Sequence, residues 1–304
     1  MKKKRSPMFH IADMVLILCL SVFILLDTFV ITREYSQVET TTEAVAASYS
    51  ADTEDVTPVL TENSYEDENI SIEITEQRYL DTTIYVADVK VSSPEYLSTA
   101  FAYSAYGKNV TDTTSSIAGE AGAILAVNGD FYGARNSGYV IRNGVIYRDT
   151  SQSSSQEDLV INSDGSFTII TEGSVTAEEL LSQGAWQVLS FGPAIIENGM
   201  ISVDENDEVG KAMASNPRTC ICEVEPLHYL LVVSDGRTSE SSGLSLYEMA
   251  EFLESLGVET AYNLDGGGSS TMVFNGRVIN NPTTGGNHIK ERSVSDIVYV
   301  GYQN

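Results

Sequence analysis

The sequence predicts an α+β fold, in which one transmembrane helix precedes a strand-rich domain of mixed β-sheet with a few packed helices. Three observations support this prediction. Short segments with alternating apolar and polar residues recur from residue 70 onward, separated by Gly, Asn and Asp turns. Two helix-capping patterns interrupt these strands. A long apolar run lies near the N-terminus.

The apolar run covers residues 11–31 and is about the length that crosses a bilayer as a helix. Four basic residues lie within residues 1–10, so the positive-inside rule places that tail in the cytoplasm and the main domain outside the cell. A cleavable signal peptide is the alternative. Its apolar region would be shorter and would be followed by small residues, whereas Arg33-Glu34-Tyr35 follows here. We therefore expect a single-pass protein of the cell membrane.

Residues 32–69 are rich in Thr, Ser, Ala, Glu and Asp and contain few large apolar side chains. Such a segment buries too little apolar surface to offset its ordering entropy. We expect a flexible acidic spacer that separates the membrane helix from a single domain at residues 70–304.

Within the domain, strict alternation predicts strands at Ile70–Ile74 and Thr83–Val91. A short helix is expected between Asp112 and Ala121, and a buried strand at Ala123–Val127. The Asn143-Gly144 dipeptide predicts a hairpin turn.

Capping boxes then predict helices that begin after Thr176 and Ser245, the second ending at Gly257. This second helix lies between two strand-like segments, which indicates a crossover packed on a sheet. Residues 294–302 read as the last strand.

The formal net charge is −26, from 43 acidic and 17 basic residues, so the surface should repel nucleic acid. Cys220 and Cys222 are two residues apart on a predicted strand, a spacing that rarely permits a disulfide. The three histidines supply no matching metal-ligand spacing, so we interpret both cysteines as core residues. Nothing in the sequence indicates the oligomeric state.

The most distinctive stretch is the glycine loop, residues 263–271, with the sequence Asn-Leu-Asp-Gly-Gly-Gly-Ser-Ser-Thr. Glycines allow a tight turn and a close approach of the backbone to a ligand. Asp265 precedes the glycines and three hydroxyl side chains follow them, a combination that suits a phosphorylated or sugar ligand. The alternative is an ordinary Gly/Ser hairpin turn.

Other polar motifs stand at the ends of apolar strands, where loops commonly carry function. In chain order they are Asn128-Gly129-Asp130-Phe131-Tyr132, Phe191-Gly192-Pro193, Asn216-Pro217-Arg218-Thr219, Asp235-Gly236-Arg237, the glycine loop, and Glu291-Arg292-Ser293. Together they resemble the phosphodiester glycosidase family over about residues 84–303, and the chain is similar to a bacterial, membrane-anchored member. Asp130 stands where many relatives have Gly, Cys222 where Gly is common, and Ser293 where Pro is usual.

The resemblance implies hydrolysis of the bond between a sugar anomeric carbon and a phosphodiester oxygen, typically with release of N-acetylglucosamine. A phosphomonoester leaves easily, so the harder tasks are stabilising an oxocarbenium-like centre and activating water. We expect Asp265 to act as base or electrostatic partner, and Asp235 to be a second catalytic carboxylate. Glu291 completes the predicted catalytic set and orients the sugar.

Arg218 and Arg237 are expected to grip phosphate oxygens through their planar forks. The remaining predicted substrate-binding groups lie on the same motifs: Asn128, Asp130, Thr219, Gly266, Gly267, Gly268, Ser269, Ser270 and Arg292. The backbone N–H groups of the three glycines are expected to donate to phosphate or sugar oxygens. No cofactor is required, although Ca²⁺ is the hard cation that extracellular carboxylates would bind.

We therefore expect an extracellular hydrolase of sugar-1-phosphodiesters, with a phosphorylated glycan of the cell envelope or an exopolysaccharide as its substrate. Two alternatives remain. One is a non-catalytic carbohydrate-binding or envelope-assembly module of the same fold, which the Asp130 departure leaves open. The other is a glycosidase that acts on unphosphorylated bonds in peptidoglycan.

Overall fold

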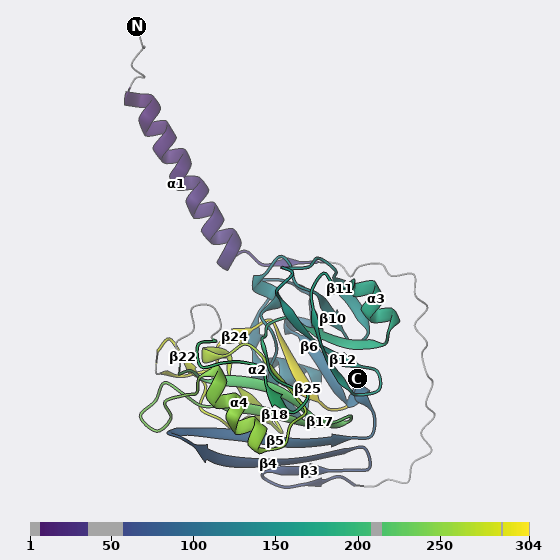
Figure 1. Cartoon of the computed structure of the whole chain (residues 1–304). Coiled ribbons are helices and arrows are strands. Elements are labelled where there is room, and N and C mark those ends of the chain that lie inside the picture. Colours follow the sequence, from purple (N-terminus) through teal and green to yellow (C-terminus); the bar gives the residue numbers. More distant parts are fainter. Residues whose placement is uncertain (1–6, 36–56, 208–214, 287, 304) are drawn as a thin grey trace.

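Strands dominate the domain, as predicted, and they form three sheets. The computed structural model describes residues 7–35, 57–207, 215–286 and 288–303 (Figure 1). The largest sheet has nine strands in the order β16 (Met200–Ile201), β15 (Ala194–Glu197), β19 (Thr260–Asn263), β17 (Arg218–Glu225), β18 (His228–Ser234), β5 (Thr82–Val91), β4 (Ile70–Tyr79), β3 (Ser64–Glu66) and β2 (Val59–Leu60).

Two five-stranded sheets complete the domain. The second sheet has the order β21 (Arg277–Val278), β20 (Met272–Phe274), β9 (Leu125–Asn128), β25 (Asp296–Val300) and β6 (Leu97–Phe101). The third has the order β11 (Val145–Arg148), β10 (Val140–Arg142), β14 (Ala185–Leu189), β12 (Glu157–Asn162) and β13 (Phe167–Thr171). Three short pairs join loops: β1 (Arg33–Glu34) with β7 (Gly107–Lys108), β8 (Asp112–Thr113) with β24 (Ser293–Val294), and β22 (Thr283–Thr284) with β23 (His288–Ile289).

The main core lies between the nine-stranded sheet and the two smaller sheets. One apolar cluster combines residues of β4, β5, β17 and β18 with residues of β9, β20 and β25 of the second sheet and β12 of the third. Helix α4 (Leu246–Ser255) covers the other face of the nine-stranded sheet (Figure 1). Helices α2 (Thr114–Ala121) and α3 (Ala177–Ser182) cover the outer faces of the second and third sheets. The sheets are therefore the inner layers of the domain and the helices the outer ones.

The local signals of the sequence are confirmed. Thr176 and Ser245 cap α3 and α4 through the predicted reciprocal capping boxes. Asn143 and Gly144 have φ angles of 51° and 73°, the left-handed pair that a two-residue hairpin turn requires. Each of these signals depends on residues within one turn of the chain, which is why the sequence determines them.

The crossover around α4 is also confirmed, but its two strands are not neighbours. Strand β17 lies between β18 and β19 and pairs antiparallel with both. Neighbouring strands pair antiparallel in all three sheets of the described residues, so the prediction of a mixed β-sheet is wrong. The parallel relation of β18 and β19 is indirect, because β17 lies between them.

The glycine loop is not a hairpin turn. The strand before it, β19, belongs to the nine-stranded sheet, and the strand after it, β20, belongs to the second sheet. Residues Gly267–Ser269 form a short 3₁₀ turn between them. The loop therefore bridges the two layers of the main core, and Asp265 stands where they meet.

The N-terminal part of the chain differs from the prediction in its boundaries. Strands β2 and β3 extend the nine-stranded sheet upstream of residue 70, so the domain begins before that predicted limit. Residues 1–6 of the basic tail and 36–56 of the predicted spacer lie outside the described residues.

Helix α1 (Pro7–Phe29) projects from the domain and exposes apolar side chains from Met14 to Leu26 (Figure 1). Among the residues that the structure describes, no helix is both long enough and apolar enough to cross a membrane. The predicted anchor at residues 11–31 is thus not confirmed and stays a prediction.

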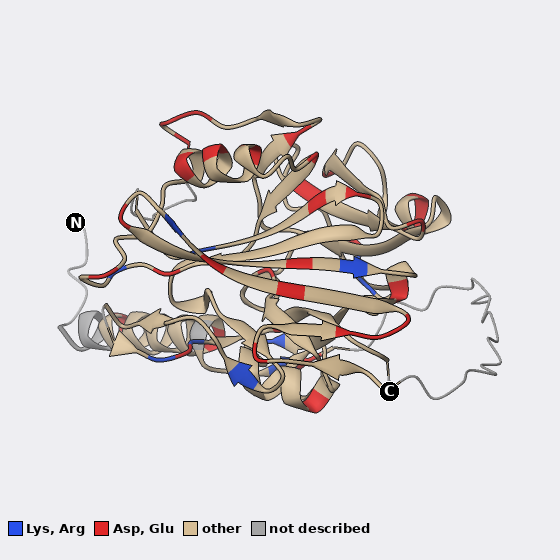
Figure 2. Ribbon diagram, turned by 90° about the horizontal axis from the view of Figure 1, so that it is seen from below, with Lys and Arg blue, Asp and Glu red and all other residues tan. Residues whose placement is uncertain are grey.

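The predicted acidic surface is visible in Figure 2, where Asp and Glu residues are spread over most elements and Lys and Arg occupy few positions. In a chain with so few basic residues, it is unusual that three arginines, Arg218, Arg237 and Arg292, lie around one cavity.

Candidate active site

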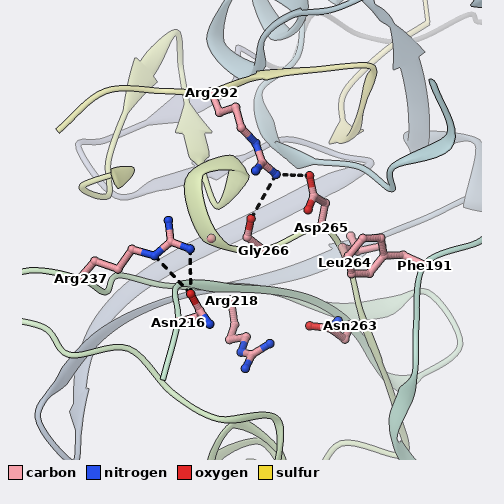
Figure 3. A pocket seen from close by; sticks show the side chains of 10 residues that line it. Phe191, Asn216, Arg218, Arg237, Asn263, Leu264, Asp265, Gly266 and Arg292 are labelled. Atoms are coloured by element: carbon pink, nitrogen blue, oxygen red, sulfur yellow. Dashed lines mark hydrogen bonds and ion pairs between the residues drawn. The ribbon is translucent and has the colours of Figure 1, made fainter. Parts of the chain in front are cut away.

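Three arginines and one carboxylate meet in a cavity of about 200 Å³ beside the glycine loop (Figure 3). The lining residues are Phe191, Asn216, Arg218, Arg237, Asn263, Leu264, Asp265, Gly266, Gly267 and Arg292. We call this space the arginine cavity. Its residues come from four of the polar motifs and from the loop itself, so the topology brings together segments that are far apart in the sequence.

Asp265 is held by two neighbours. Its Oδ2 atom accepts hydrogen bonds from the Arg292 guanidinium at 2.5 Å and from the Ser269 hydroxyl at 2.6 Å. Arg292 Nε also donates to Ser269 Oγ at 2.8 Å, which closes a three-membered network. The Oδ1 atom accepts no hydrogen bond from the described residues. The hydrogen bonds to Oδ2 thus orient the carboxylate, and Oδ1 is available to contact a substrate.

Three guanidinium side chains lie on the wall of the arginine cavity. Arg237 Nε and Nη2 both donate to Asn216 Oδ1, at 3.2 and 2.8 Å, which fixes the guanidinium at the cavity wall (Figure 3). Burial lowers the pKa of Arg237, and the positive charges of Arg292 and Arg218 lower it further. Arg218 is buried and donates from Nε to Leu244 O at 2.9 Å. Bringing these guanidinium charges close together costs electrostatic free energy, and a bound phosphate would lower that cost.

The glycines of the loop allow neighbouring segments to pack closely against its backbone. A Cβ atom on Gly267, whose φ is 62°, would lie 2.8 Å from Nη2 of Arg237. One on Gly266 would lie 2.9 Å from Pro217 O, and one on Gly268 would lie 3.0 Å from the Thr284 hydroxyl. The Gly267 N–H donates to Pro217 O at 2.8 Å and is thus already paired within the protein, although Gly267 lines the cavity.

Several residues predicted to bind substrate instead hold the loop in place. Asn128 is fully buried, donates to Asp265 O at 2.6 Å, and accepts from the Thr219 hydroxyl at 2.8 Å and from the Thr271 N–H at 3.3 Å. Thr219 is itself fully buried, and so is Ser270. These residues join β9, β17 and the glycine loop, so the structure gives them a positioning role.

Asp265 also borders a second cavity of about 260 Å³. The other lining residues are Thr28, Asn109, Thr111, Asp130, Phe131, Gly133, Ala134, Ser293, Val294 and Ser295. This second cavity has hydroxyl, amide and aromatic groups on its wall and no Lys or Arg. The carboxylate of Asp265 therefore stands between a cavity lined by three arginines and a polar cavity without Lys or Arg.

Asp130 has a structural partner that the sequence reasoning missed. Arg142, from β10, is buried and donates from Nη2 to Asp130 Oδ2 at 2.9 Å and to Asp296 Oδ2 at 2.8 Å. Burial, together with the charge of Asp130, raises the pKa of Asp296 to about 8. A Cβ atom on Gly129 would lie 2.4 Å from Asp296 Oδ1, so the Asn-Gly-Asp motif packs directly on this triad.

Two signals in the sequence pointed to the triad without revealing the pairing. Arg142 belongs to an apolar strand of the Asn-Gly hairpin, and Asp296 is the only charged residue of the final strand β25. A charged residue on a buried strand requires a partner. The partner comes from a different sheet, and so only the tertiary structure identifies it.

Asp235 and Glu291 border neither cavity. Asp235 accepts hydrogen bonds from the Asn281 N–H at 2.8 Å and from the Asn280 side chain at 3.2 Å, and so anchors the segment after β21. Glu291 accepts from the N–H and the hydroxyl of Ser115, at 3.0 and 2.6 Å, in the first turn of α2. Their predicted catalytic roles have no support in this geometry, because both side chains are committed to backbone and loop contacts.

No cluster of three or more His, Cys, Asp or Glu side chains that could hold a metal is found among the described residues. Cys220 and Cys222 are unpaired and buried in the core, as expected.

Similarity to known proteins shows the family of this chain. The sequence model of the phosphodiester glycosidase family matches residues 121–301, more than half of the chain. The N-acetylglucosamine-1-phosphodiester alpha-N-acetylglucosaminidase of Mus musculus is 33% identical over 188 residues, which are 56% of this chain and 35% of that protein. The Homo sapiens enzyme is 34% identical over 190 residues, covering 56% of this chain and 36% of that protein.

A SPbeta prophage-derived uncharacterized protein of Bacillus subtilis, YomE, is 27% identical over 292 residues, or 90% of this chain and 42% of that protein. The chain thus spans less than half the length of these curated relatives.

Two crystallised proteins share the fold. One is the catalytic domain of zebrafish N-acetylglucosamine-1-phosphodiester alpha-N-acetylglucosaminidase, auto-inhibited by its pro-peptide, with a TM-score of 0.60 and 19% identity over 77% of this chain and 83% of that one. The other is a hypothetical protein from Synechocystis, with a TM-score of 0.53 and 15% identity over 77% of this chain and 62% of that one. With a family match over most of the domain, this chain belongs to the phosphodiester glycosidase family.

Proposed function

We propose that this protein hydrolyses the bond between the anomeric carbon of a sugar and a phosphodiester oxygen, with N-acetylglucosamine-1-phosphodiesters as the substrate class. One observation carries the proposal: Asp265 borders both the arginine cavity and the second cavity, which has no Lys or Arg on its wall. The printed activity of the mammalian relatives supports the choice of sugar and linkage.

The two cavities suit the two halves of this substrate. The phosphate binds between the guanidinium groups of Arg218, Arg237 and Arg292, which offer charge-assisted hydrogen bonds. The sugar binds in the second cavity, where hydroxyl and amide groups match its hydroxyls and Phe131 offers an apolar face. The scissile bond then lies beside Asp265.

Hydrolysis needs one carboxylate and a stabilised leaving group. Water adds its OH to the anomeric carbon, the bond from that carbon to the phosphate oxygen breaks, and the phosphomonoester leaves with the bonding electron pair. The arginines stabilise the charge that develops on the phosphate. Asp265 stabilises the oxocarbenium-like carbon or takes the proton of water. Arg292 forms an ion pair with Asp265 and orients the carboxylate for either task.

We propose that cleavage needs no metal ion, because the three guanidinium groups supply the positive charge that a cation would otherwise bring to the phosphate. The test of the function is incubation of the purified chain, with EDTA or with Ca²⁺, with an alkyl N-acetylglucosamine-1-phosphodiester, with free sugar measured by chromatography. We expect sugar release in both conditions. Tight glycan binding without release would instead indicate a binding module, and cleavage of an unphosphorylated N-acetylglucosaminide would indicate an ordinary glycosidase.

Replacing Arg237 by Gln should weaken phosphate binding about 10- to 100-fold, the loss typical of a charged hydrogen-bonding partner. The measurement is the inhibition constant of inorganic phosphate against sugar release. Arg277→Gln is the matched control, because Arg277 is exposed and its ion pair with Glu62 lies on the surface. Equal inhibition constants for both variants would argue against the arginine cavity as the phosphate site.

We propose that the protein acts outside the cell on envelope or exopolysaccharide substrates and is held at the membrane by residues 11–31. The exposed apolar side chains of α1 support this location. We expect the full chain to stay in the membrane fraction after an alkaline carbonate wash, and a variant without residues 1–31 to appear in the soluble fraction. Release of the full chain by the wash would argue against the anchor.

A further inference from the structure

The last residues of α1 and the segment that follows them contact the surface of the domain. Arg33 and Glu34 form β1, which pairs antiparallel with Gly107 and Lys108 of β7. The Tyr35 N–H continues the pairing by donating to Tyr106 O at 2.8 Å. We call residues 27–35 the docked segment.

Side chains of the domain hold the start of this segment. Asn109 Nδ2 donates to Ile31 O at 2.9 Å and to Asp27 O at 3.4 Å. Lys108 is buried, and its Nζ atom lies 3.8 Å from Asp27 Oδ2. Asp27 in turn forms an ion pair with Arg33. These hydrogen bonds and ion pairs hold the segment against the domain at both of its ends.

Gly107 fits the docked segment so closely that no side chain is accommodated. A Cβ atom there would lie 2.1 Å from Arg33 O and 2.9 Å from the Cα atom of Glu34. The three nearest atoms all belong to the docked segment, so a side chain at this position would first displace that segment.

The docked segment closes one side of the second cavity. Thr28 lies on the cavity wall together with Asn109, and Asp130 and Asp265 line the same space. The cavity keeps a volume of about 260 Å³ with the segment in place. The segment therefore forms a wall of this space and does not fill it.

We propose that residues 27–35 are part of the substrate site, in which Thr28 provides a hydrogen-bonding contact to the sugar and the docked backbone completes the sugar-binding cavity. This inference rests on the proposed function, which assigns the sugar to the second cavity. It makes the chain between α1 and the domain a determinant of sugar binding, so that residues outside the family match complete the site.

The test uses Gly107→Ala in the full chain, which displaces β1 without changing any residue that lines either cavity. We expect KM for the sugar phosphodiester to rise about tenfold, the loss of one or two hydrogen bonds, while the inhibition constant of inorganic phosphate stays the same. Trypsin should cleave after Arg33 faster than in the wild type. The control is Gly119→Ala, since a Cβ atom on Gly119 has no neighbour within 4 Å.

A second variant tests Thr28 independently of the docking. Thr28→Val keeps the shape of the side chain and removes its hydroxyl, and it should raise KM several-fold with unchanged phosphate inhibition. Wild-type KM in both variants would overturn the proposal, and so would a higher kcat/KM in Gly107→Ala, which would show that the segment blocks the site. Absence of sugar release by the wild-type protein would instead refute the proposed function itself.

Discussion

Replacing Asp265 by Asn should lower kcat for sugar release by about 10³-fold, the range that loss of a general base or of a charge-stabilising carboxylate produces. The change keeps the shape of the side chain, so the hydrogen bonds from Ser269 and Arg292 to this position can persist. What disappears is the negative charge beside the anomeric carbon. The melting temperature should change little, and inorganic phosphate should still bind.

Asp235→Asn is the informative control for this variant. Asp235 was the second carboxylate suggested by the motif order, yet it binds Asn280 and Asn281 and borders neither cavity. We expect its replacement to leave kcat within about threefold of the wild type, because no transition-state contact is lost. A loss as large as that of Asp265→Asn would return the catalytic role to Asp235, and more than a tenth of wild-type activity in Asp265→Asn would refute the mechanism.

Replacing Arg142 by Met should destabilise the folded protein by about 3–5 kcal/mol at neutral pH, because it leaves buried carboxylates without their cation. Asp130 and Asp296 both bind this guanidinium, and all three side chains are buried. Urea unfolding gives the free energy directly. Arg277→Met, at an exposed site, should cost less than about 1 kcal/mol.

The loss should depend on pH with a definite sign. In the wild type, burial and Asp130 raise the pKa of Asp296 to about 8, far above its value in the unfolded chain. A group of this kind stabilises the fold below its unfolded pKa, and that contribution is lost as the pH rises through the folded pKa. Without Arg142 the repulsion between the carboxylates grows, so the Met variant should be closest to wild type near pH 5 and furthest from it near pH 8.

Neutralising the carboxylates should rescue the variant. Adding Asp130→Asn and Asp296→Asn to Arg142→Met removes both buried charges and should recover part of the lost stability. A loss below about 1 kcal/mol in Arg142→Met, or no dependence on pH, would show that the triad is not the ionic core that its geometry indicates.

The Asp265 and Arg142 variants test two different parts of the domain. Asp130 belongs to the buried triad and Gly129 packs on it, whereas Asp265 borders the arginine cavity. Asp130 therefore has a structural reason in this chain for standing where many relatives have Gly. The departure does not weaken the case for an active enzyme, because the side chain is paired with Arg142.

Local patterns in the sequence determined the strands, the two capped helices, the Asn-Gly turn and the order of the polar motifs. Each depends on residues a few positions apart, so short-range periodicity and capping specify it. Asp265 and the arginines could be selected in the same way, from charge and from the chemistry of a phosphate ester.

Only the tertiary structure decided what each polar residue does. The glycine loop looked like a hairpin, but its flanking strands belong to different sheets. Asn128 and Thr219 were predicted to bind substrate but are buried and hydrogen-bonded to each other. No local pattern in the sequence placed Arg142 beside Asp130 or Thr28 beside the second cavity. The reason is physical: whether a polar side chain faces a cavity or a buried partner depends on contacts between separate elements of the fold, such as Asn128 with Asp265 and Arg142 with Asp296, which no local pattern encodes.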